Sequence, residues 1–126
     1  MTQKQRSILG VLFCGTAVIL GAFGAHLLKA YLSFDALQSY EVGVRYQFFH
    51  GLALLFLSAD KRLFTKRTVL FFVTGTILFS GSIYGLSLGN LVSISILPKI
   101  LGPITPIGGL LLILGWLNLL IGYFRS

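Results

Sequence analysis

The sequence predicts an all-α membrane protein, a four-helix transmembrane bundle, from three observations. Of the 126 residues, 56% are hydrophobic and only 10% are charged, whereas roughly a quarter of the residues in a soluble domain are charged. Several apolar runs reach the length of about 20 residues that a helix needs to cross a bilayer. These runs are continuous and not alternating, which excludes a β-barrel, the other structure that satisfies the backbone in lipid. We expect residues 1–126 to form a single integral membrane domain without a soluble catalytic domain.

Four apolar runs are expected to cross the membrane. The first follows Lys4 and Arg6, and it is longer than the apolar region of a signal peptide, which covers about 7 to 15 residues. We therefore expect this run to be retained in the mature protein. The second run is the most polar, because it contains Arg45, Gln47 and His50. The expected transmembrane helices are residues 8–28, 42–59, 68–88 and 106–124.

The segments that join these runs carry weaker signals. Thr105 and Pro106 precede the fourth run, where a threonine suits the N-cap and a proline suits the first helical position. Ser33 is followed by apolar residues at three-residue spacing, which predicts a short amphipathic helix that leads into the second run. Apolar and polar residues alternate within the segment from Asn90 to Leu101. This alternation is typical of an extended strand, and an interfacial or re-entrant segment is the alternative.

The basic residues predict the orientation. Cytoplasmic loops carry an excess of Lys and Arg, so we expect both termini in the cytoplasm, in a multi-pass protein of the cell inner (plasma) membrane. The net charge of +7 then reflects topology and the attraction of anionic lipids to the cytoplasmic loop, and not nucleic-acid binding. The basic side carries Lys4, Arg6, Lys61, Arg62, Lys66, Arg67 and Arg125, the other side carries Lys29 and Lys99, and Arg45 lies just inside the second run.

Small residues mark the faces on which we expect the helices to pack. Helices in lipid associate where small side chains let their backbones approach, and the 15 glycines supply such faces. Packing within one bundle is the main interpretation, and a homo-oligomer or a larger membrane complex formed through an outer groove is the competing one. The predicted faces are Gly10, Ala17, Gly21 and Gly24 in the first helix, Gly81, Gly85 and Gly89 in the third, and Gly108, Gly115 and Gly122 with Asn118 in the fourth.

Polar side chains gather in the outer half of the predicted membrane segment. At about 100° per residue, Tyr46, Gln47 and His50 share one face of the second helix. Arg45 lies off this face, one turn from Glu41, and we expect the two to form an ion pair. Polar groups in hydrocarbon are candidates for function. The candidate binding cluster is His26, Arg45, Tyr46, Gln47, His50, Tyr84 and Thr105.

The cluster has four interpretations. It is a structural hydrogen-bond network, a site for a small ligand or lipid headgroup, a pathway for protons or solutes, or a metal or catalytic site. The last is least favoured, because two histidines without an intramembrane acid are too few ligands for zinc, and Cys14 is the single cysteine. The acids are Asp35, Glu41 and Asp60, which leaves no intramembrane carboxylate pair and no Ser-His-Asp set. We therefore expect no catalytic residue, no metal, no cofactor and no enzyme activity.

Four short motifs follow one another along the chain in a fixed order. They are GAFGAH at residues 21–26, YQFFH at 46–50, FSGSIY at 79–84 and TPIGG at 105–109. With these motifs the chain resembles the YgdD/YwdK-like family of small inner-membrane proteins, catalogued as domain of unknown function 423, with animal relatives named transmembrane protein 256. The resemblance implies four membrane helices and supplies no mechanism. The matching motif residues include His26, Tyr46, Gln47, His50, Ser80, Tyr84, Thr105 and Pro106.

The sequence supports two functional hypotheses. The first is a non-enzymatic structural or accessory membrane subunit in which the His/Tyr/Gln cluster holds the helices in place. The alternative is a binding or transport protein for a small molecule or a lipid headgroup, with the same cluster as its site.

Overall fold

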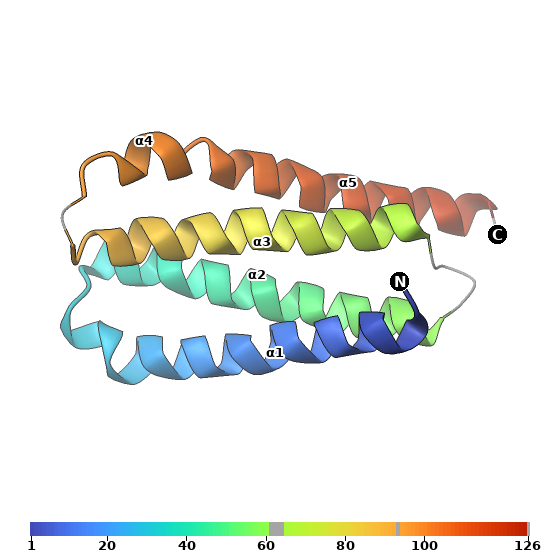
Figure 1. Cartoon of the computed structure of the whole chain (residues 1–126), viewed down its shortest axis with the longest axis horizontal. Helices are drawn as coiled ribbons and strands as arrows, with labels where there is room; N and C mark the ends of the chain where they lie inside the picture. Colours follow the sequence, from blue (N-terminus) through green and yellow to red (C-terminus); the bar gives the residue numbers. More distant parts are fainter. Residues whose placement is uncertain (61–64, 93, 126) are drawn as a thin grey trace.

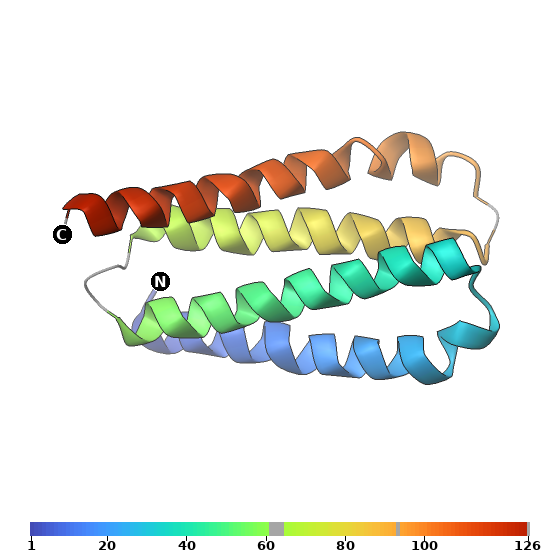
Figure 2. The same cartoon turned by 180° about the vertical axis from the view of Figure 1, so that it is seen from behind.

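The computed structural model describes residues 1–60, 65–92 and 94–125, and these residues form helices and turns without a strand. The long helices α1, α2, α3 and α5 run lengthwise and alternate in direction (Figure 1, and from behind in Figure 2). The elements are α1 (Gln3–His26), a 3-10 helix η1 (Leu28–Ala30), α2 (Phe34–Ala59), α3 (Lys66–Gly89), α4 (Leu97–Leu101) and α5 (Ile104–Arg125).

Three continuous helical stretches are long and apolar enough to cross a membrane: Gln3–Ala30, Lys66–Gly89 and Leu97–Arg125. The fourth long helix, α2, has 26 residues and is more polar. It packs between α1 and α3. The predicted four-helix bundle is therefore confirmed. Each helix begins before the predicted apolar run, because its polar first turns are also helical, whereas α1 ends at His26, before the predicted end at residue 28.

Two predicted helix starts differ from the structure. The expected short amphipathic helix is the first part of α2, and the Ser33 hydroxyl caps it by accepting the N–H of Ala36 at 3.2 Å. The expected N-cap role of Thr105 is wrong, because α5 begins one residue earlier at Ile104. The Thr105 hydroxyl instead bonds to the hydroxyl of Ser82 on α3. Thr105 therefore links α5 to α3 and does not cap the start of α5.

The segment before α5 is folded back as turns and a short helix. Leu91 N–H donates to the carbonyl of Leu88 at 3.0 Å, and α4 begins at Leu97 with a proline in its first turn. Of the two conformations that the sequence left open, the extended one is therefore excluded for the described residues, while Ser93 lies outside them. A Cβ placed on Gly89 would lie 2.8 Å from Leu97 Cδ1. The small residue thus lets α4 pack against the end of α3.

The close helix pairs are α1 with α2, α2 with α3, and α3 with α5. Gly10 and Gly51 make the first pair close, because a Cβ on either one would lie 2.9–3.0 Å from the carbonyl oxygen of the other. Gly108 and Gly115 bring α5 close to α3. A Cβ on Gly108 would meet the backbone of α3, and one on Gly115 would lie 2.7 Å from Phe72 Cδ1. Packing within the bundle is confirmed for these predicted faces. At Gly81 and Gly122, in contrast, a Cβ would meet no atom within 4 Å.

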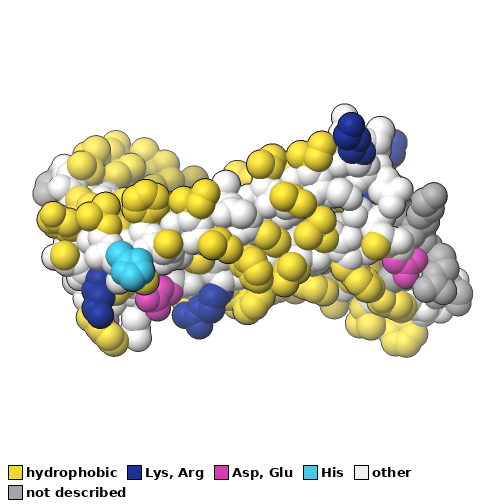
Figure 3. Space-filling model, turned by 90° about the horizontal axis from the view of Figure 1, so that it is seen from below, with side chains coloured by type: hydrophobic (Ala, Val, Ile, Leu, Met, Phe, Trp, Pro, Cys, Tyr) yellow, Lys and Arg dark blue, Asp and Glu magenta, His cyan; other side chains and the backbone are white. Residues whose placement is uncertain are grey.

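Both termini lie at one end of the bundle, together with the end of α2 and the start of α3, and η1 and α4 lie at the other end (Figure 1). Lys66, Arg67 and Arg125 are at the end with the termini, whereas Lys61 and Arg62 lie outside the described residues. The face seen in Figure 3 is apolar along its middle, with charged side chains toward the two ends. The side of the membrane that each end faces remains a prediction.

Candidate functional site

Gln47 is the centre of a hydrogen-bond network that joins three helices. Its amide Nε2 donates to the carbonyl of Phe13 at 2.9 Å and to Thr16 Oγ1 at 2.6 Å, both on α1. Its Oε1 accepts the hydroxyl of Tyr84, on α3, at 2.7 Å. Gly43, one turn earlier on α2, makes room for this tyrosine, because a Cβ there would lie 2.9 Å from Tyr84 Cε1. Gln47 is 8% exposed, so this network links α1, α2 and α3 away from solvent.

His50 links α2 to α5. The indole N–H of Trp116 donates to His50 Nε2 at 3.0 Å, and His50 Nδ1 lies 2.7 Å from the carbonyl oxygen of Tyr46. An indole N–H can only donate, so Nε2 accepts and Nδ1 carries the proton given to the carbonyl. Phe72 packs against both rings, with centroids 5.4 Å from His50 and 4.8 Å from Trp116. The imidazole is therefore neutral and has a partner at each nitrogen.

We expect Trp116→Phe to lower the free energy of unfolding by about 1 kcal/mol, since the lost bond leaves a buried acceptor without its donor. Packing against Phe72 is largely kept, because phenylalanine retains an aromatic ring. Thermal unfolding in detergent measures the change. Trp116→Phe should add little when His50 is already replaced by leucine; equal losses in both backgrounds would contradict the bond.

His26 and Arg45 lie outside the hydrogen bonds of Gln47 and His50, and Tyr46 takes part only through its backbone carbonyl. His26 is exposed at the last position of α1, and Arg45 is exposed on α2. The predicted ion pair of Arg45 with Glu41 is wrong: Arg45 Nε donates to the backbone carbonyl of Glu41 at 3.4 Å, and the two described side chains form no salt bridge. Both side chains are exposed, where ion pairing contributes little. Tyr46 is 41% exposed; its ring is tilted against that of Phe79 with centroids 4.8 Å apart, and it stacks on His50 at 6.1 Å.

Two further polar contacts fasten neighbouring helices. Ser80 donates from α3 to the carbonyl of Gly43 on α2 at 2.7 Å. Near the end with the termini, Asn118 Oδ1 accepts the hydroxyls of Thr65 and Thr68. The sequence placed Asn118 on a packing face of the fourth helix, but it could not identify these partners, because they depend on how far one helix is shifted along the next.

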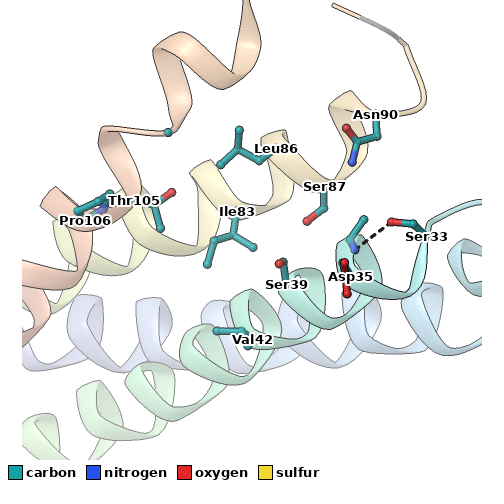
Figure 4. A pocket seen from close by; sticks show the side chains of 12 residues that line it. Ser33, Asp35, Ser39, Val42, Ile83, Leu86, Ser87, Asn90, Thr105 and Pro106 are labelled. Atoms are coloured by element: carbon teal, nitrogen blue, oxygen red, sulfur yellow. Dashed lines mark hydrogen bonds between the residues drawn. The ribbon is translucent and has the colours of Figure 1, made fainter. Parts of the chain in front are cut away.

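Two cavities lie toward the ends of the bundle, and no residue of the Gln47 network lines either of them. One, of about 620 Å³, opens between the first turns of α2, the last turns of α3 and the start of α5 (Figure 4). Of the predicted site residues, Thr105 lines it. A second, of about 600 Å³, lies at the opposite end and is lined by Thr65, Lys66, Arg67, Asn118, Ile121, Gly122 and Arg125.

The described residues contain no group of three or more His, Cys, Asp or Glu side chains that could hold a metal ion. His50, the one buried histidine among them, already uses both nitrogens in hydrogen bonds. Cys14 Sγ lies 3.6 Å from the carbonyl oxygen of Phe48. Gln47, His50 and Ser80 are thus arranged for hydrogen bonding between helices.

Comparison with known proteins places the chain in a family. Residues 20–109 match the model of the family described as Protein of unknown function (DUF423). A UPF0382 membrane protein of Staphylococcus aureus is 41% identical, with 98% of each chain covered. One of Staphylococcus saprophyticus is 42% identical, covering 98% of this chain and 99% of that protein. No solved structure matches. The chain therefore belongs to this uncharacterised family of membrane proteins.

Proposed function

We propose that this protein is a non-enzymatic structural or accessory subunit of the membrane. The observation that carries the proposal is the full hydrogen bonding of Gln47 and His50, two polar side chains of α2 that face its neighbouring helices. Gln47 uses both ends of its amide, and His50 uses both ring nitrogens. A catalytic base or a ligand-binding side chain needs an accessible hydrogen-bonding position, and these two residues have used theirs to join helices.

Small residues on the outside of the bundle support an accessory role. A Cβ on Gly15, Gly81 or Gly122 would meet no atom within 4 Å, so none of the three is needed for packing within this chain. Small residues at a helix surface let another helix approach closely in lipid. We therefore infer that one of these faces receives a helix of another membrane protein or of a second copy.

Purification after gentle solubilisation tests the accessory role. We expect a second membrane protein, or a second copy, at fixed stoichiometry in native mass spectrometry from nanodiscs. Of Gly15→Leu, Gly81→Leu and Gly122→Leu, the change on the face that is used should reduce this association without changing the melting temperature, whereas Ile77→Leu, a conservative change at an exposed position of α3, should leave it intact. Recovery of a single chain alone from nanodiscs, or solute flux through liposomes that contain only this chain, would overturn the proposal.

We further propose that the protein lies in the bacterial plasma membrane with both termini in the cytoplasm. Most Lys and Arg residues of the sequence belong to the termini or to the loop between the second and third membrane helices, and cytoplasmic segments carry an excess of these residues. Alkaline phosphatase fused after Ser126 should be inactive, since it folds only outside the cytoplasm. Green fluorescent protein at the same position should fluoresce. High phosphatase activity with a dark fluorescent fusion would place the termini outside.

The basic groove at this end is proposed to hold anionic lipid headgroups. Lys66, Arg67 and Arg125 line it together with the polar Asn118, and each Lys or Arg near a membrane surface contributes about 1 kcal/mol of attraction to acidic lipid. Native mass spectrometry from mixed nanodiscs should show phosphatidylglycerol retained over phosphatidylcholine. The double change Arg67→Gln and Arg125→Gln should abolish the preference, and Lys29→Gln at the other end should not. An unchanged preference would contradict this role.

A further inference from the structure

The cavity at the end of the bundle near η1 and α4 is built by three helices and has polar and apolar walls. Its volume is about 620 Å³, within the range of about 300 to 1,000 Å³ typical of small-ligand sites. Val42, Ile83 and Leu86 form part of its apolar wall. The polar side chains that line it are Ser33, Asp35, Ser39, Ser87, Asn90 and Thr105.

The Ser87 hydroxyl is a buried polar group without a partner in this wall. The residue is 3% exposed, and its Oγ has no hydrogen bond. Figure 4 shows this hydroxyl directed from α3 toward the first turns of α2, where Asp35 and Ser39 lie. Other buried serines of α3 are bonded, Ser80 to Gly43 and Ser82 to Thr105. An unsatisfied buried hydroxyl destabilises the fold, and a bound molecule that hydrogen-bonds to it would offset this cost.

The charge of the wall indicates the kind of molecule. Asp35 is the one ionisable side chain among the residues that line the cavity. The start of α5 also faces the cavity, and a helix N-terminus carries roughly half a positive charge. However, Pro106 has no N–H to offer, and the Thr105 hydroxyl is already bonded to Ser82. Asp35 lies in the first turn of α2, so the partial positive charge of that helix end also offsets part of its charge. The Asp35 carboxylate remains the one full charge in the wall and favours a cation.

We propose that this cavity binds an amphipathic organic cation, a molecule with an amine or quaternary ammonium head and an apolar tail. The head lies between the Asp35 carboxylate and the Ser87 hydroxyl, and the tail lies along Val42, Ile83 and Leu86. The same chemistry occurs in an ethanolamine phospholipid of the bilayer and in a free alkylammonium compound. This inference does not depend on the proposed accessory function, because it concerns a different set of side chains.

A single cysteine in the cavity provides the test. In a Cys14→Ala chain in nanodiscs of phosphatidylglycerol, Ser87→Cys would be labelled with a cationic trimethylammonium and an anionic sulfonate methanethiosulfonate reagent. Relative to a free thiol, we expect the cationic reagent to react about tenfold faster, since a charged cavity concentrates ions of opposite sign. Asp35→Asn should remove this preference. Glu41 is an exposed carboxylate of the neighbouring groove, and Glu41→Gln should leave the preference intact. Ser80 is buried between α3 and α2, so the thiol of Ser80→Cys should be unreactive.

Protection from labelling distinguishes the sources of the ligand. If octyltrimethylammonium and phosphatidylethanolamine nanodiscs both protect the thiol of the Ser87→Cys chain, the bilayer supplies the ligand. If octyltrimethylammonium alone protects this thiol, the ligand is a free cation. Equal rates for the two reagents, or no protection by either amine, would overturn the proposal.

A measurement on the native side chains covers the case in which Ser87→Cys does not fold. Native mass spectrometry of the wild-type chain with octyltrimethylammonium should show one bound cation. Asp35→Asn should weaken this binding about tenfold, which corresponds to about 1.4 kcal/mol, while Glu41→Gln should not. No bound cation on the wild-type chain, or equal binding to Asp35→Asn, would overturn the proposal.

Discussion

Replacing Gly108 by alanine is expected to lower the free energy of unfolding by about 3 kcal/mol, the upper part of the range for overpacked positions. The three atoms nearest to a Cβ at this position all belong to the backbone of Leu78 and Phe79 on α3, with Leu78 C only 2.8 Å away. A flexible side chain can rotate out of the way, but a helix backbone cannot. The added methyl group must therefore push α5 away from α3 along their shared contact.

Two other glycines of the same helix provide matched controls. A Cβ on Gly109 would lie 3.5 Å from Phe79 Cδ1, which is ordinary contact, and one on Gly122 would meet no atom within 4 Å. Gly→Ala at these positions should change stability by at most about 1 kcal/mol, and in the favourable direction, because alanine is the better helix former. Steric-trap unfolding in bicelles measures all three variants. Equal losses at Gly108 and Gly122 would show that the close approach of α3 and α5 does not stabilise the fold.

These glycines also show how far the sequence predicts the packing. Gly108, Gly115 and Gly122 repeat every seven residues, which places them on one face of a helix. The structure packs the first two against α3. Periodicity cannot show that the last turn of α5 extends past the first turn of α3 (Figure 1). The face was therefore predictable, but the length over which it is used depends on the offset between the two helices.

The same limit applies to the polar network. The spacing of Gln47 and His50 placed both on one face of the second helix, and the structure buries both. Their partners Thr16 and Trp116 lie on two different helices. Neither partner follows from the spacing within one helix, because a contact between helices depends on their shift and rotation. Arg45 illustrates the opposite error, since its position one turn from Glu41 permitted an ion pair that the exposed side chains do not form.

Gln47→Leu is the second change with a large expected effect, because it removes three hydrogen bonds between helices at once. Such bonds contribute on average about 0.6 kcal/mol each in membrane proteins, with a maximum near 1.7. We therefore expect a loss of about 2 kcal/mol, or more if the hydroxyl of Tyr84 finds no new acceptor. Gln38→Leu is the matched control, since Gln38 is exposed on the same helix and its replacement should change stability by at most about 0.5 kcal/mol.

A double-mutant cycle then assigns the loss to a specific contact. Tyr84→Phe removes only the hydroxyl that donates to Gln47 Oε1, so its cost should largely disappear in a Gln47→Leu chain. We expect a coupling energy of about 0.6 to 1.7 kcal/mol between the two positions, and a similar coupling between Gln47 and Thr16→Val across the α1 contact. Additive losses would mean that Gln47 stabilises the bundle only by filling space. Coupling at both contacts would mean that one side chain fixes the relative positions of α1, α2 and α3, which is the property that a structural subunit requires.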